Sequence, residues 1–246
     1  MAQHSNAFQQ LLLGRRFRKE IDAALALDPR DVQAKRDLLE FYLLAPGIAG
    51  GSRRDAALTA ERIAALDAAE GFLARARLAA FDKAPAQTEA MLRSATEVLP
   101  PSYRARIALA DFYLEPEHSN QFGAEAAAQD ALRLDPGRAD AYAILASVYA
   151  GRGAGRELDQ ILAEAARNVP DDRYPEYRAA QRLIDDGKNL DLAEGYLRDY
   201  LAQKPEGNRP VAAEAMPLLD RIRAARSHPQ LKRDLSGRPK SQTKNY

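Results

Sequence analysis

The stretch ADAYAILASVYAGRGAGRELDQILAEAARNVP, residues 139–170, carries the clearest periodic pattern in the chain. Apolar residues recur three or four positions apart, as at Tyr142, Leu145 and Tyr149, and this spacing is typical of one face of an α-helix. Pro170 ends the pattern, because proline cannot continue a helix. We interpret the stretch as two helices joined by a turn.

The ending of this stretch recurs along the chain with a period of roughly 34 residues. Helix-ending phrases such as ALALDP and ALRLDP close at Pro29, Ala68, Pro100, Pro136, Pro170 and Pro205. No segment shows the sustained alternation of apolar and polar residues that is typical of a β-strand. This period, with two helices in each unit, predicts an all-α fold made of stacked helix pairs.

The unit over residues 139–170 resembles the tetratricopeptide repeat (TPR) family. The positions typical of the family are held by Tyr142, Leu145, Ala146, Tyr149, Ala165 and Pro170. Leu158 and Leu162 depart from the family in residue type, although they keep the apolar face. The resemblance covers roughly residues 31–205. It implies a right-handed superhelical solenoid of about five helix pairs with N- and C-terminal helices.

The repeat positions divide the chain into expected segments. A flexible N-terminus over 1–8 precedes the solenoid over 9–226, which ends in a capping helix over 211–226. The repeat units are expected at 32–68, 69–100, 103–136, 139–170 and 173–205. The remaining segment, 227–246, is rich in lysine and arginine and poor in apolar residues, which predicts a disordered basic tail.

The composition excludes several classes of function. The chain of 246 residues has a formal net charge of +1, which does not favour nucleic acid as a partner. No apolar run approaches the ~20 residues that span a bilayer. Cysteine is absent, which excludes disulfides, cysteine nucleophiles and thiolate zinc sites. The histidines lack metal-binding spacing, and no serine lies in a nucleophile motif. We therefore expect no metal, no cofactor and no enzyme activity.

The glycine-rich stretch FYLLAPGIAGGSRRDAA, residues 41–57, raises the question of a phosphate site. It lacks the preceding strand and the lysine of a phosphate-binding loop, so we interpret it as an elongated turn between two helices. The alternative is an anion or phosphate site, or a catalytic subunit role, centred on residues 45–54 with Ser52, Arg53 and Arg54. A similar elbow occurs in bacterial TPR proteins that look exported. This resemblance implies a periplasmic or cell-envelope protein if a signal peptide has been removed, and a cytoplasmic protein otherwise.

A stacked-helix architecture without catalytic motifs favours an interaction scaffold that holds a peptide or partner segment in a concave groove. In the TPR register, the second, fifth, ninth and twelfth positions of each first helix point into that groove. The predicted groove residues are Gln33, Arg36, Glu40, Leu73, Arg77, Arg104, Ile107, Asp111, Ser147, Tyr174, Tyr177 and Gln181. Arginine supplies a planar donor fork for carboxylates, and tyrosine supplies apolar area. The predicted partner is therefore a protein segment with acidic and apolar residues.

Overall fold

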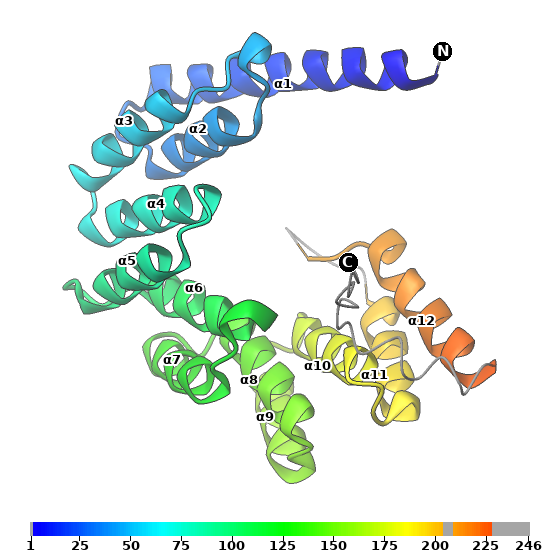
Figure 1. Ribbon diagram of the computed structural model, residues 1–246. Coiled ribbons are helices and arrows are strands. Elements are labelled where there is room, and N and C mark those ends of the chain that lie inside the picture. The colour runs from blue at the N-terminus through cyan, green and yellow to red at the C-terminus, as the bar shows by residue number, and fades with distance from the viewer. Residues whose placement is uncertain (1, 204–208, 228–246) are drawn as a thin grey trace, which may run out of the picture. The chain divides into compact units, whose positions relative to one another are not determined.

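The computed structural model describes residues 2–203 and 209–227, with side chains from residue 14 onward (Figure 1). Every regular element in these ranges is a helix, which confirms the predicted all-α fold. The α-helices are α1 (Ala2–Leu27), α2 (Val32–Leu44), α3 (Arg53–Ala64), α4 (Ala68–Phe81), α5 (Pro85–Glu97), α6 (Tyr103–Leu114), α7 (Gln121–Leu134), α8 (Ala139–Arg152), α9 (Gly155–Asn168), α10 (Tyr174–Asp185), α11 (Leu190–Ala202) and α12 (Ala212–Ser227). Two short 3-10 helices, η1 (Gly47–Ala49) and η2 (Pro116–His118), lie in the turns after α2 and α6.

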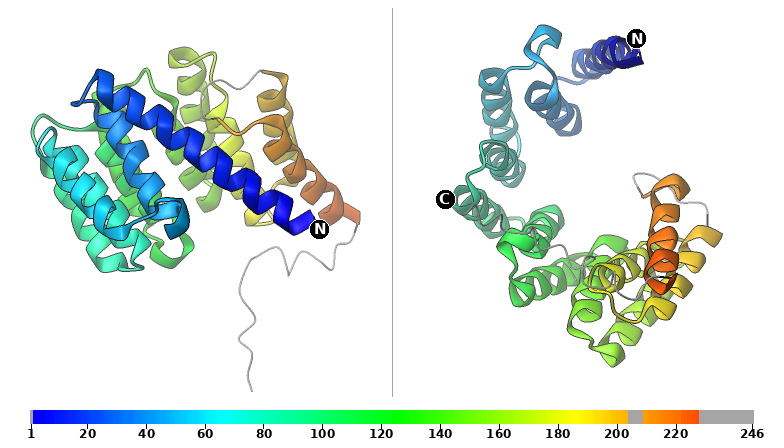
Figure 2. Two further views of the ribbon diagram at one scale, coloured as in Figure 1. Left: turned by 90° about the horizontal axis from the view of Figure 1, so that it is seen from above. Right: turned by 45° about the vertical axis from the view of Figure 1, so that its right-hand side comes forward.

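The chain divides into two compact units, and the boundary lies inside α6. Unit 1 comprises residues 1–109 and unit 2 comprises residues 110–246. Helices that follow one another pack side by side within each unit, as α4 does with α5 and α10 does with α11 (Figure 2). Each expected repeat unit between residues 32 and 205 contains two α-helices. The predicted superhelix depends on how the two units are placed relative to each other, so it stays a prediction.

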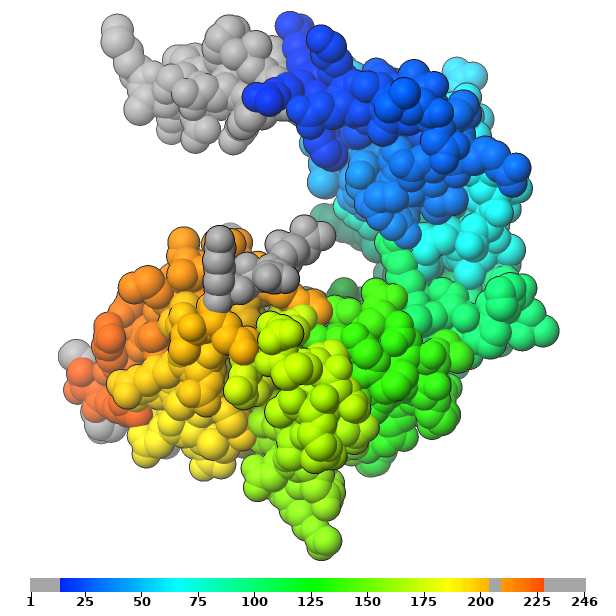
Figure 3. All heavy atoms as spheres, turned by 180° about the vertical axis from the view of Figure 1, so that it is seen from behind, coloured from blue at the N-terminus to red at the C-terminus, as the bar shows by residue number. Residues whose placement is uncertain are grey.

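Small side chains set the close approach of helices within a unit. In α3, Ala56 and Ala60 are fully buried. Gly71 of α4 lies so close to the end of α3 that a Cβ atom there would stand 2.4 Å from the Cβ of Ala64. In the space-filling view, the coloured helices of each unit form a continuous packed body (Figure 3). Because alanine and glycine let two helix backbones approach, the small residues of the repeat determine where the helices cross.

Larger side chains fill the space between the helix pairs of unit 2. Tyr142 and Leu145 of α8 are 0% and 1% exposed. The amide of Asn168 donates a hydrogen bond of 2.6 Å to the hydroxyl of Tyr142, so this buried polar atom is satisfied. Tyr149 is half-buried, and its hydroxyl donates to Glu125 Oε1 at 3.0 Å. The apolar stripe read from the sequence therefore forms the core of unit 2.

Side-chain caps explain where several first helices begin. Asp31 accepts a hydrogen bond of 3.0 Å from the backbone N–H of Ala34 and begins α2. Asp67 accepts one of 2.9 Å from the N–H of Glu70 and begins α4. Each cap satisfies an N–H group that has no partner inside the helix. The caps also place the next residues, including Glu70, in the first turn.

The structure differs from the sequence prediction at the start of the chain, whereas the expected capping helix over 211–226 is present as α12. Residues 2–8, expected to be flexible, belong to helix α1. The last helix begins at Ala212 and contains Pro217 within it, and it buries Leu218 and Ile222. The predicted basic tail lies outside the described residues, apart from Ser227, which ends α12.

Candidate functional site

The first helix of each pair carries the residues that were predicted to line a groove. These first helices are α2, α4 and the start of α6 in unit 1, and the end of α6, α8 and α10 in unit 2. We call the two sets of predicted positions the first-helix face of unit 1 and the first-helix face of unit 2. The side chains on these two faces make different kinds of contact.

In unit 1, Arg77 of α4 binds Glu40 of α2 with both of its donor nitrogens. Arg77 Nε lies 2.7 Å from Glu40 Oε1, and Nη2 lies 2.8 Å from Oε2. Both residues occupy the ninth position of their repeat. Two parallel N–H···O bonds are the strongest geometry that arginine forms with a carboxylate, so this pair joins two neighbouring first helices firmly.

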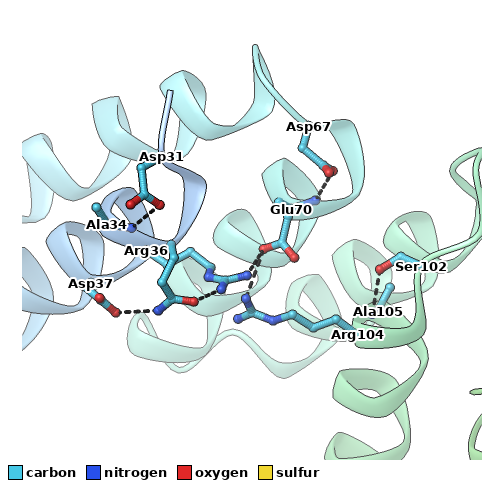
Figure 4. A network of polar contacts seen from close by, with 10 residues as sticks. Asp31, Ala34, Arg36, Asp37, Asp67, Glu70, Ser102, Arg104 and Ala105 are labelled. Atoms are coloured by element: carbon cyan, nitrogen blue, oxygen red, sulfur yellow. Dashed lines mark hydrogen bonds and ion pairs between the residues drawn. The ribbon is translucent and has the colours of Figure 1, made fainter. Parts of the chain in front are cut away.

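A second cluster on the same face joins three first helices through one carboxylate. Arg36 Nη1 of α2 lies 2.9 Å from Glu70 Oε2 of α4, and Arg104 Nη1 of α6 lies 3.2 Å from the same oxygen (Figure 4). The side chain of Glu70 is only 12% exposed. Burial raises the pKa of this carboxyl above its ordinary value, and the nearby charge of Arg36 opposes that shift. Gln33 accepts a further hydrogen bond from Arg36 and donates one of 2.9 Å to Asp37.

These ion pairs differ from the sequence prediction for unit 1, in which the arginines were available to bind carboxylates of a partner. Arg36, Arg77 and Arg104 lie on the first-helix face, but each already binds a carboxylate of a neighbouring first helix. They are therefore not free donor forks. An acidic partner group would have to displace Glu40 or Glu70 to reach them.

In unit 2, the first-helix face contains a hollow of about 740 Å³. Its floor includes Ser147 of α8 and Gln181 of α10, two of the predicted groove residues. It is lined by Leu114, Pro116, Ser119, Ser147, Gly151, Arg178, Gln181, Arg182, Asp185, Asp186 and Lys188. The hollow lies between α8 and the ends of α6 and α10, and the guanidinium of Arg182 covers Gly151, where a Cβ atom would stand 2.7 Å from Arg182 Nε.

The charged side chains around the hollow differ in the number and the distance of their ion-pair partners. Asp186 binds two cations, since Arg182 Nε and Lys188 Nζ both lie 3.2 Å from its carboxylate. Arg178 lies 3.5 Å from Asp111, another predicted groove residue. Burial raises the pKa of the Asp111 carboxyl, and the charge of Arg178 opposes that shift. Asp185 instead binds Arg221 of α12 at 2.9 Å.

The two tyrosines that were predicted as a binding pair have different environments. Tyr177 is 7% exposed and packs against Tyr200, with ring centroids 4.9 Å apart, so it belongs to the core. Tyr174 is half-buried, and its ring stacks on that of Tyr177 with centroids 6.0 Å apart. The guanidinium carbon of Arg209 lies 4.3 Å from the centre of the Tyr174 ring. The tyrosine pair is therefore covered from within the chain.

Two other predicted groove residues, Leu73 and Ser147, are buried, and Ser147 is 7% exposed although it borders the hollow. Leu73 is 8% exposed and belongs to the core of unit 1. Ile107 is half-buried. The face predicted from the register is therefore interrupted by core residues, because the repeat position alone does not determine how deeply a side chain lies.

The sequence analysis missed two residues that join these contacts, Glu70 and Asp140. Each is the second residue of its repeat unit, a position that the TPR register assigns to the groove. Applying that rule at every unit would have included both. Arg209, which binds Asp140, lies beyond the repeats, and we find no sequence pattern that would have placed it on this face.

The glycine-rich stretch forms the elongated turn that the sequence indicated. The backbone N–H groups of residues 49–52 all donate to carbonyl oxygens of the same stretch, at 2.8–3.1 Å. Ser52 caps α3 by accepting from the N–H of Asp55, and Arg53 binds Asp82 at 2.6 Å. Gly51 is required because a Cβ there would stand 1.8 Å from the carbonyl oxygen of Ala45. The N–H groups of residues 49–52 and the side chain of Arg53 are therefore engaged within the chain, and the side chain of Arg54 is exposed.

The part of the chain that the structure describes contains no group of three His, Asp or Glu side chains placed to hold a metal ion. Among those same residues, no helix has the length and apolar character needed to cross a bilayer.

Comparisons with known proteins give a likeness of fold at low identity. No protein-family model matches the sequence, and no curated protein matches it either. Solved structures with a similar fold include YrrB, described as a TPR protein with an unusual peptide-binding site, and MamA. The YrrB match has 14% identity and a TM-score of 0.46, and covers 81% of this chain and 97% of YrrB. The MamA match has 19% identity and a TM-score of 0.46, and covers 62% of this chain and 88% of MamA.

Proposed function

We propose that this chain is a non-enzymatic interaction scaffold that binds a segment of a protein partner on the first-helix face of unit 2. The observation that carries the proposal is the hollow of about 740 Å³ between α8 and the ends of α6 and α10. Partner segments bind concave surfaces that are already formed, because little rearrangement is then needed.

The lining of the hollow suits a peptide segment. Gln181 is half-buried and carries an amide that can donate and accept hydrogen bonds. A peptide backbone presents the matching acceptors and donors. Leu114 and Pro116 add apolar surface at one edge. These groups support binding of an extended segment with both polar and apolar parts.

The charges of the hollow favour an acidic group on the partner. The lining contains the cations Arg178, Arg182 and Lys188 against the carboxylates Asp185 and Asp186, so it carries one more positive charge than negative. A carboxylate of the partner could approach Arg182 or Lys188, which share Asp186. The positive charge of the hollow supports a partner with an acidic group, as inferred from the sequence. That group would bind in the hollow of unit 2 and not at the arginines of unit 1.

The test compares two substitutions to tryptophan, one inside the hollow and one on the surface away from it. Gln181→Trp places a large side chain in the hollow, and Gln160→Trp places the same side chain on the exposed surface of α9. Immobilised parent and variants are compared for the proteins that they retain from a lysate of the source cells, and circular dichroism checks their helicity. The expected result is that Gln181→Trp loses a partner that both the parent and Gln160→Trp retain. If Gln181→Trp keeps every partner of the parent, the hollow is not the binding site.

The alternative site at residues 45–54 receives less support. The N–H groups of residues 49–52 and the side chain of Arg53 are engaged within the chain. A phosphate titration monitored by thermal unfolding tests it directly. Stabilisation of the parent that is lost in an Arg53→Ala/Arg54→Ala variant would favour an anion site there.

A further inference from the structure

We propose that Asp140, Asp172 and Tyr174 form a binding site for an arginine side chain, and that Arg209 of the same chain occupies it as an internal ligand. An arginine on a partner segment would bind there in place of Arg209. Binding of a partner's arginine at this site rests on the proposed function, since the site lies on the first-helix face of unit 2. The site itself does not depend on the hollow.

The contacts of Arg209 define the site. Its Nη1 lies 2.7 Å from Asp140 Oδ1, at the start of α8. Its Nε and Nη2 both lie 2.8 Å from Asp172 Oδ2, in the loop before α10. Its guanidinium carbon stands 4.3 Å from the centre of the Tyr174 ring. One guanidinium is thus held by two carboxylates at its edge and an aromatic ring on its face.

The three receptor groups are held in place by contacts that do not involve Arg209. Asp172 Oδ1 accepts a hydrogen bond of 3.0 Å from the backbone N–H of Tyr174, so this carboxylate is fixed to the start of α10. The Tyr174 ring stacks on the buried ring of Tyr177, and its hydroxyl accepts from Arg178 at 3.0 Å. Asp140 belongs to the first turn of α8, and Arg138 Nη2 lies 3.9 Å from its Oδ2. The site would therefore keep its shape when Arg209 leaves it.

The geometry selects a guanidinium over an ammonium group. Different nitrogens of one planar group reach Asp140 and Asp172, while the face of the same plane lies over Tyr174. Arginine offers several donors in a fixed plane and stacks on aromatic rings, whereas lysine offers one compact charge. A lysine side chain could satisfy one of the carboxylates but not both with the ring at once.

The site is accessible and lies where a partner segment is expected. The side chains of Arg209, Asp140 and Asp172 are 22%, 28% and 30% exposed. Asp140 and Tyr174 are the second residues of two consecutive repeat units, so both lie on first helices. A partner that carries an arginine must compete with Arg209, because the internal ligand is always present at high local concentration. Arg209 therefore lowers the affinity of this face for such a partner.

The test vacates the site and offers it a free arginine side chain. The probes are the Nα-acetyl amides of arginine and of lysine, and binding is followed by thermal unfolding and by titration. We expect Arg209→Ala to bind the arginine probe at least ~10-fold more tightly than the parent chain does, because its site is empty. We also expect the arginine probe, and not the lysine probe, to raise the unfolding temperature of Arg209→Ala.

Two further variants make the result specific. Arg198→Ala removes an exposed arginine that binds Glu194 on α11, and it should respond to the arginine probe as the parent does. Asp172→Asn in the Arg209→Ala background should abolish the response. Equal responses of Arg209→Ala and Arg198→Ala, or equal responses to the two probes, would overturn the proposal.

Two controls keep the test decisive. If Arg209→Ala does not fold, Arg209→Lys keeps the positive charge, and the arginine probe should still bind it more tightly than it binds the parent. Gln181→Trp in the Arg209→Ala background should retain the response to the probe. Failure of the hollow experiment and failure of this one are therefore distinguishable, because the probe needs no protein partner.

Discussion

The first-helix faces of the two units use the same repeat positions in different ways. At the ninth position, unit 1 has Glu40 and Arg77, two long side chains of opposite charge that bind each other. At the same position, unit 2 has Asp111, which lies 3.5 Å from Arg178, and then Ser147 and Gln181, which line a hollow of about 740 Å³. One face is closed by its own ion pairs, and the other is open beside a site that Arg209 fills from outside the repeats.

This difference shows that the repeat register positions a side chain but does not determine whether that side chain is available to a partner. Availability depends on which residues of the next repeat lie within reach, at the equivalent position for Glu40 and Arg77 and at a different one for Arg36 and Glu70. Complementary long side chains satisfy each other, and short ones leave space. The four predictions that follow test this comparison.

The largest effect is expected from removing the core beneath the open face. Leu145 of α8 is 1% exposed, and Leu145→Ala should lower the free energy of unfolding by about 3 kcal/mol, because it loses buried apolar surface and leaves a cavity. Equilibrium denaturation measures the change. Leu27→Ala, at a side chain that is 89% exposed, is the control and should change the stability little. A loss as small as that of the control would contradict the assigned register.

The stability of unit 1 should depend on Glu70, whose carboxylate joins two arginines on the first-helix face. Glu70→Ala should lower the free energy of unfolding by about 2 kcal/mol, because it leaves Arg36 and Arg104 close together without their shared carboxylate. The matched control is Glu61→Ala, which removes a 62% exposed carboxylate from Arg75 and should cost about 0.5 kcal/mol or less. Similar losses for the two variants would show that the cluster does not stabilise unit 1.

Unit 2 should lose stability at alkaline pH, because burial raises the pKa of Tyr142, Tyr149 and Tyr177 and, most strongly, of Tyr196 and Tyr200. Burial raises the pKa of both Tyr196 and Tyr200 to about 12. Between the ordinary tyrosine pKa of about 10 and that value, the folded chain keeps protons that the unfolded chain releases. Stability should therefore be complete below pH ~10 and fall as the pH rises toward 12.

The measurement is denaturant unfolding across this pH range, together with the ultraviolet absorbance of tyrosinate. Tyr200→Phe should flatten the alkaline loss, because it removes one of the titrating groups. It should also cost about 1 kcal/mol at neutral pH, because the Tyr200 hydroxyl donates to the carbonyl of Pro210 at 2.7 Å. An unchanged pH dependence in this variant would show that Tyr200 does not contribute to it.

The smallest effect on stability should come from converting the open face into a closed one. Ser147→Glu combined with Gln181→Arg places the Glu40–Arg77 type of pair at the ninth positions of unit 2. An exposed ion pair contributes roughly 0–1 kcal/mol, so the unfolding free energy should change little provided that the new carboxylate extends from the buried position 147 into the hollow, where it meets the new guanidinium. Partner capture should nevertheless be lost, because the pair fills the hollow. If the double variant captured the partner as well as the parent does, the contrast between the two faces would not govern binding.

The residues that could be predicted from the sequence are those whose role is local. Pro170 ends a helix, and the apolar spacing of Tyr142 and Leu145 defines a buried stripe. The glycine-rich stretch was also interpreted correctly as a turn. The exposure of Tyr177 was not predictable in the same way, because its burial depends on Tyr200, a residue of another helix.

The sequence by itself determined the helix pairs, their period and the residues at each first-helix position, because helix ends and apolar spacing are properties of neighbouring residues. Only the tertiary structure decided which of those residues are free. Glu70 joins residues 34 positions before and after it, and Arg209 reaches an aspartate 69 residues away. Packing of whole helices brings such partners together, so no local pattern in the sequence specifies them.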